Sequence, residues 1–157
     1  MIPLKDDNPT YSTPIITYSI IAICVIVFLL ELSSPNYNNG AIFYSWGVIP
    51  ASLIHDMQLP SEVYRVPPVA TLFTSMFMHG GFMHLIGNML YMWIFADNIE
   101  EELGKTKFII FYLLSGVAAA LTQVYMNTES TIPMVGASGA IGGCLLYTSP
   151  SPRDCRL

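Results

Sequence analysis

The feature that most constrains the fold is an apolar segment near the start of the chain. Residues Ile15 to Leu32 carry no charge except Glu31, and about 18 helical residues nearly cross a hydrocarbon core of about 30 Å. Over all 157 residues, 53% are hydrophobic and 11% charged, with a mean hydropathy of +0.52, which is too apolar for an ordinary soluble domain. The sequence predicts an all-α, polytopic bundle of membrane helices in a lipid bilayer.

Three further apolar segments extend this pattern. We expect one helix from Phe82 to Leu103, which ends because an acidic run and Gly104 follow. The next helix is expected from Phe108 to Met126 and a fourth from about Gly136 onward. The stretch from residue 115 to residue 120 is rich in small side chains, which allow membrane helices to approach closely.

The connection between the first two spans, residues 33–70, is half apolar and rich in proline. It contains Tyr44 and Trp46, and such aromatic side chains favour the membrane interface. We therefore expect a structured interfacial layer with short helices, and a disordered linker is the alternative.

The few basic residues predict the orientation of the bundle. Lys5 precedes the first span and Lys105 and Lys107 lie between the second and third, whereas the first connection offers only Arg65. By the positive-inside rule, residues 1–14 form a cytoplasmic N-terminus. Ser138 then enters the membrane from the outer side.

Charge and ligand spacing exclude several classes of partner. The formal net charge is −5 and basic residues do not cluster, so no nucleic-acid partner is expected. The three cysteines lack a CxxC or CxxH spacing, and the methionines lack a thiolate or second histidine at ligand spacing. We predict neither a metal site nor a cofactor.

Ser138 is the candidate nucleophile, because it lies among small residues in the run Gly136-Ala137-Ser138-Gly139-Ala140 at a helix start. Backbone N–H groups and the helix dipole favour negative charge there. His84 and Asn88 lie four residues apart, on one helical face, and add side-chain donors. Serine-catalysed peptide hydrolysis needs a nucleophile, a general base and donors for the oxyanion. We expect the helix of Ser138 to pack against the face of His84 and Asn88.

Each feature also has a structural interpretation. Ser138 can be a small residue at a helix contact, and His84 and Asn88 can be polar contacts between membrane helices. Glutamates 100 to 102, followed by lysines 105 and 107, would ordinarily be a solvated helix end. The occurrence of all the motifs in order favours the functional interpretation.

From about residue 71 to residue 143, the chain resembles the rhomboid intramembrane serine proteases of bacterial type. The resemblance rests on three ordered motifs: residues 73–89 (FTSMFMHGGFMHLIGNM), residues 100–104 (EEELG) and residues 136–140 (GASGA). It implies an integral, multi-pass protein of the bacterial inner membrane that cleaves transmembrane protein substrates. Residues 15–143 then form a partial rhomboid domain with the N-terminal four of six expected transmembrane helices.

The resemblance also implies a role for each matching residue. Ser138 is the nucleophile, and the oxyanion hole consists of His84, Asn88 and the backbone N–H of Ser138. Gly136 and Gly139 belong to the nucleophile motif. His79 is implied to be structural, and Glu100 is implied to tie the second helix to the preceding loop, with Glu101 or Glu102 as substitutes if the register slips.

The sequence departs from the family pattern in two places. Many members carry a Trp-Arg pair where this chain has Ala70-Thr71. The family's dyad histidine lies on a sixth helix, and none of His55, His79 and His84 matches that position. We therefore expect the 157-residue chain to be inactive for lack of its general base. The alternatives are an inactive rhomboid-like protein that binds transmembrane clients and, more remotely, a transporter or channel fragment.

The last residues, 144–157, do not continue as a membrane helix should. They include two prolines and three charged residues, which stop a membrane helix. We expect this segment to be a non-native tail on a truncated reading frame.

Overall fold

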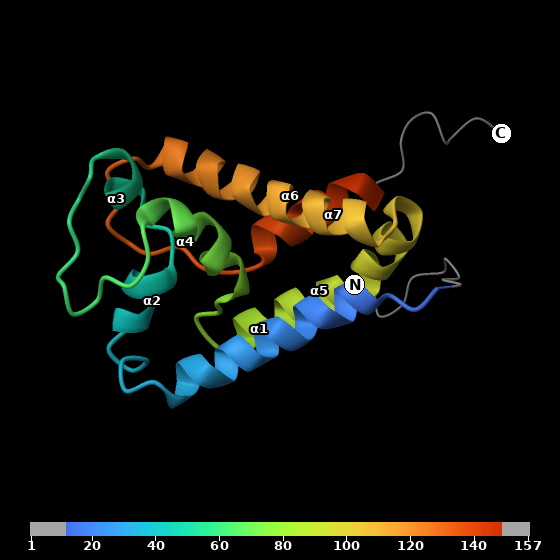
Figure 1. Cartoon of the computed structure of the whole chain (residues 1–157), viewed down its shortest axis with the longest axis horizontal. Helices are drawn as coiled ribbons and strands as arrows, with labels where there is room; N and C mark the ends of the chain where they lie inside the picture. Colours follow the sequence, from blue (N-terminus) through green and yellow to red (C-terminus); the bar gives the residue numbers. More distant parts are fainter. Residues whose placement is uncertain (1–11, 149–157) are drawn as a thin grey trace.

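The computed structural model describes residues 12–148, and every regular element among them is helical (Figure 1). The only β-type pairing in this part of the chain is an isolated antiparallel bridge between Val48 and Met134. The all-α prediction is confirmed. The elements, in chain order, are α1 (Ile15–Ser33), α2 (Ala41–Trp46), α3 (Pro50–Ile54), α4 (Pro68–Thr74), the 3-10 turn η1 (Ser75–Phe77), α5 (Phe82–Leu103), α6 (Lys105–Met126) and α7 (Ser138–Thr148).

Glycines determine two of the helix boundaries. Gly104 follows the last residue of α5 with φ +76°, a backbone conformation that glycine adopts without steric cost. Gly136 has φ +125°, which is incompatible with a right-handed helix. Helix α7 therefore begins at Ser138, two residues after the start expected at about Gly136. The expected layer of short helices between the first two spans is present as α2 and α3.

Two helices are each long and apolar enough to cross a membrane, α1 and α6. The segments Pro68–Phe77 and Phe82–Leu103 qualify only when taken together, with a bend of 78° at the break between them. Helix α7 is apolar but has only 11 residues, fewer than the roughly 17 that a spanning helix needs. The described residues therefore contain two to three candidate spans. The predicted second span, Phe82 to Leu103, is the second member of this pair and does not qualify alone.

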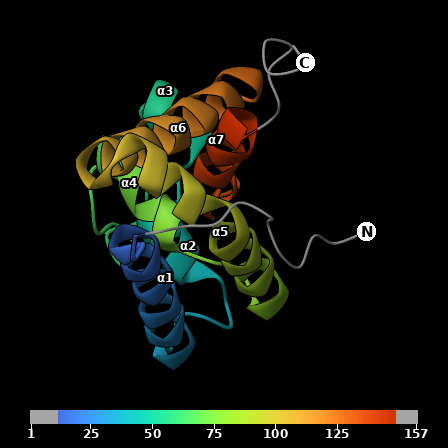
Figure 2. The ribbon, with the colours of Figure 1, turned by 90° about the vertical axis from the view of Figure 1, so that its right-hand side faces the viewer.

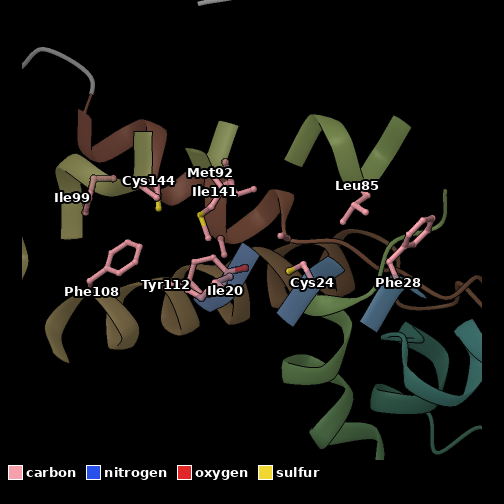
Figure 3. Close-up of a cluster of buried hydrophobic side chains, with 13 residues drawn as sticks. Ile20, Cys24, Phe28, Leu85, Met92, Ile99, Phe108, Tyr112, Ile141 and Cys144 are labelled. Carbon is pink, nitrogen blue, oxygen red and sulfur yellow. The ribbon is translucent and has the colours of Figure 1, made fainter. Parts of the chain in front are cut away.

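Helices α1, α5, α6 and α7 lie together in the bundle (Figure 2) and share an apolar core. Helix α1 packs along α5, and α7 packs against both α5 and α6. The core takes side chains from all four helices (Figure 3), among them Ile20, Cys24, Phe28, Leu85, Met92, Ile99, Phe108, Tyr112, Ile141 and Cys144. Residues 144–148 continue α7, and Cys144 is buried in this core. The rest of the predicted non-native tail lies outside the described residues.

Small residues bring α7 close to α6, as the sequence predicts. A Cβ atom added to Gly139 would lie 2.6 Å from the Cβ of Ala119. One turn further along α7, a Cβ on Gly143 would overlap the side chain of Ser115. Glycines four residues apart on α7 thus allow a close approach to the small side chains of Ala119 and Ser115 on α6.

Glu100 has a different partner from the one that the family resemblance implies. Its carboxylate accepts hydrogen bonds from the backbone N–H groups of Ile16 and Thr17, at 3.0 and 2.8 Å, and from the Thr17 hydroxyl at 2.9 Å. A carboxylate in this position satisfies free N–H groups of the first turn and interacts favourably with the helix dipole. Glu100 therefore ties α5 to the start of α1, and not to the loop that precedes α5.

The packing of α7 on α6 predicts different effects for substitutions of two glycines in α7. Gly139→Ala should lower the free energy of unfolding by about 1–3 kcal/mol, because the new methyl group overpacks the contact with Ala119. Gly142→Ala meets no atom within 4 Å and should be neutral or stabilising by up to about 1 kcal/mol. Unfolding by denaturing detergent, followed by circular dichroism, measures both. Equal effects of the two variants would contradict this packing.

Candidate active site

The segment that leads into Ser138 is held by backbone hydrogen bonds to two other parts of the chain. Val48 and Met134 exchange a pair of N–H to carbonyl bonds, at 3.0 and 2.8 Å. The N–H of Gly136 donates to the carbonyl oxygen of Ser75 in η1, at 2.9 Å. The segment between α2 and α3 and the turn η1 therefore both hold the loop that leads into α7.

Gly136 lies directly against His84. A Cβ atom added to Gly136 would lie 2.6 Å from Nε2 and 2.7 Å from Cε1 of the His84 ring, and 3.7 Å from Nδ2 of Asn88. The position has φ +125°, so both the backbone conformation and the available space require glycine. This contact brings the loop before α7 onto the polar face of α5.

Ser138 shares a cavity with His84 and Asn88, as expected from the motifs. The cavity has a volume of about 340 Å³ between α5 and α7, and Tyr91 and Gly142 are among its other lining residues. Ser138 is the first residue of α7 and is exposed. The first N–H groups of a helix have no partner within the helix, so the Ser138 N–H is available near its own hydroxyl.

Asn88 is the most informative donor of this cavity. The residue is 7% exposed, and its Nδ2 is buried without a hydrogen-bond partner among the described residues. Leaving such a donor unsatisfied costs about 1–3 kcal/mol, and buried polar groups in proteins are nearly always paired. The amide is therefore available for an acceptor that residues 12–148 do not supply.

His79 lies behind His84 and not in the cavity. It is fully buried, and its ring centroid is 5.2 Å from that of His84 with the two rings tilted by 66°. Its backbone N–H donates to Oε2 of Glu31, at 3.3 Å. Sequence reasoning missed Glu31 as a site residue, although a carboxylate inside an apolar span is itself a functional signal.

The remaining predicted residues lie elsewhere. Gly139 faces α6, and Glu100 is three turns of α5 beyond Asn88, at the opposite end of that helix. Nε2 of His55 lies 2.8 Å from Oε1 of Glu129 at an exposed contact. Among residues 12–148, no group of three or more His, Cys, Asp or Glu side chains is placed to hold a metal ion.

The fold and the site together define a helical membrane protein with a serine and two polar donors near the starts of two packed helices, α5 and α7. The family model for the Rhomboid domain matches residues 60–151, which is more than half of the chain. The chain belongs to the rhomboid family.

Several curated relatives support this assignment. The chain is 32% identical over 144 residues to the Rhomboid protease GluP of Bacillus subtilis (strain 168), covering 89% of this chain and 26% of that protein. It is 28% identical over 141 residues to the Rhomboid protease AarA of Providencia stuartii, covering 82% and 47%. It is also 30% identical over 87 residues to Inactive rhomboid protein 1 of Drosophila melanogaster, covering 55% and 6%. The chain thus spans less than half the length of these relatives, which include both proteases and an inactive protein.

The contact at Gly136 predicts a specific sensitivity. Gly136→Ala should cost about 1–3 kcal/mol of stability, because its methyl group must displace the His84 ring and the backbone is strained. Gly80→Ala, which meets open space before α5, should cost less than about 1 kcal/mol. Detergent unfolding measures the cost, and the imidazole NMR signals of His84 should move in Gly136→Ala only. Unchanged His84 signals in Gly136→Ala would rule out this contact.

Proposed function

We propose that this chain carries the nucleophile and oxyanion hole of an intramembrane serine endopeptidase that cleaves transmembrane substrates. The observation that carries the proposal is the unpaired Nδ2 of Asn88, which lines the same cavity as Ser138 and His84. Membership of the rhomboid family, which includes named proteases, supports the same conclusion.

In the proposed reaction, the Oγ atom of Ser138 forms a bond to the scissile carbonyl carbon and loses its proton to a general base. The carbonyl oxygen becomes an oxyanion, which accepts hydrogen bonds from Asn88, His84 and the Ser138 N–H. The base then gives the proton to the leaving amine as the C–N bond breaks, which leaves an acyl group on Ser138. Water next attacks the acyl carbon and loses a proton to the base, and the bond to Ser138 Oγ breaks as that oxygen regains a proton.

The general base is the part that the three histidines of this sequence do not provide. His84 is assigned to the oxyanion hole, His79 is buried behind it, and His55 is paired with Glu129. The family resemblance places the base on a later helix. We therefore propose that the 157-residue chain by itself is inactive.

The location follows from the same proposal. The basic residues on either side of the spans favour a cytoplasmic N-terminus, and the resemblance to bacterial members favours a bacterial inner membrane. Ser138 then lies toward the extracytoplasmic side, where a transmembrane substrate enters from the bilayer.

These roles are tested by substitutions in a longer form of the chain that includes the family's later helices, here called the parent. Ser138→Ala should abolish cleavage of a transmembrane substrate, because the covalent route is lost. Asn88→Ala should lower kcat by about 10²–10³, the typical effect of removing one oxyanion donor. Ser19→Ala is the control, since that exposed hydroxyl donates within its own helix, to the carbonyl oxygen of Ile15. If the parent cleaves no substrate although it is folded, the alternative of an inactive, client-binding protein is favoured.

The 157-residue chain offers a complementary test with a fluorophosphonate probe in liposomes. We expect no Ser138-dependent labelling, because this chain is proposed to lack the general base, and base catalysis alone raises a reaction rate roughly 10²–10⁴-fold. Robust labelling that Ser138→Ala removes would show that His84 or His79 acts as the base, and the assignment of His84 to the oxyanion hole would then be wrong.

A further inference from the structure

The break between η1 and α5 places His79 close to the site, yet this segment has few constraints of its own. Gly80 and Gly81 follow His79, and a Cβ on either would meet no atom within 4 Å. Gly81 caps α5 without a side-chain hydrogen bond. Glycine pairs have high conformational freedom, so the position of His79 must be fixed from outside the segment.

Helix α1 supplies that constraint. The Oε2 atom of Glu31, a residue only 2% exposed, accepts the hydrogen bond from the His79 N–H across 48 residues of sequence. Phe28, one turn earlier on α1, packs edge to face on Phe82 at the start of α5, with ring centroids 5.0 Å apart. Burying a carboxylate costs free energy. The Glu31 carboxylate contacts the chain at the break before α5, the helix that carries His84 and Asn88.

The contacts continue from His79 to the candidate oxyanion hole. The fully buried ring of His79 lies edge to face against the ring of His84. The Cε1 and Nε2 edge of His84 in turn faces Gly136. The orientation of the His84 ring therefore depends on the ring of His79 and on the loop that leads into Ser138.

We propose that Glu31 is a positioning residue for the site: it fixes His79, and the His79 ring sets the orientation in which His84 presents its donor to the oxyanion. This inference rests on the proposed function for its catalytic consequence, although the positioning itself is a property of the described chain. Glu31 acts through His79 and touches no reacting atom.

The chain with 15N-labelled histidine, in lipid nanodiscs, tests the positioning directly. Glu31→Ala should shift or broaden the imidazole signals of His84, and so should His79→Ala. Glu31→Gln should leave them near their original positions, because the amide oxygen still accepts the His79 N–H. The double variant Glu31→Ala/His79→Ala should differ little from His79→Ala, since residues that act through one path are not additive.

The matched control is Cys24→Ala, which removes a fully buried side chain of α1 two turns before Glu31 and keeps both partners of the Glu31–His79 hydrogen bond. It should lower stability and leave the His84 signals in place. If Glu31→Ala leaves the His84 signals unchanged, or if Cys24→Ala shifts them equally, the positioning role is wrong.

In the longer parent, Glu31→Ala should lower kcat by about 10- to 100-fold with little change in KM, as expected when a remote substitution misplaces a group by about 1 Å. Glu31→Gln should restore kcat to within a few fold. A loss confined to KM would overturn the proposal. A parent inactive even before substitution would refute the proposed function, and the NMR result would still decide the positioning.

Discussion

The close contact of Gly136 with the His84 ring is the constraint on which the site depends. It is possible only because position 136 has no side chain and has a positive φ, and because Ser75 accepts the Gly136 N–H. Any outward movement of this loop would carry Ser138 away from α5. The backbone, rather than a side-chain hydrogen bond to Ser138, thus sets the distance between the candidate nucleophile and its donors.

The bundle supports this contact from both ends of α5. At one end, the Glu100 carboxylate caps the first turn of α1. At the other, Glu31 of α1 holds His79, three residues before the first residue of α5. Two buried carboxylates thus tie the same pair of helices together, while the glycines of α7 allow it to lie against α6. Ser138 is consequently the first residue of a helix whose position is fixed on two sides.

The sequence predicts the main helices and the meeting of the site residues, and it misses two contacts between residues far apart in the chain. Apolar segments and stop signals locate α1, α5 and α6, and the motifs bring Ser138 together with the face of His84 and Asn88. The partner of Glu100 and the role of Glu31 are missed, because these contacts join residues 84 and 48 positions apart, which local patterns do not report. The catalytic roles themselves remain predictions.

The contact between Gly136 and His84 can be measured directly by solid-state NMR in lipid bilayers, with 13C at Gly136 Cα and 15N in the His84 ring. The account predicts direct dipolar transfer between Gly136 Cα and His84 Nε2. The hydrogen-bonded pair of Val48 N and the Met134 carbonyl carbon provides the positive control. Transfer in the control pair but none between Gly136 and His84 would contradict a shared site for Ser138, His84 and Asn88.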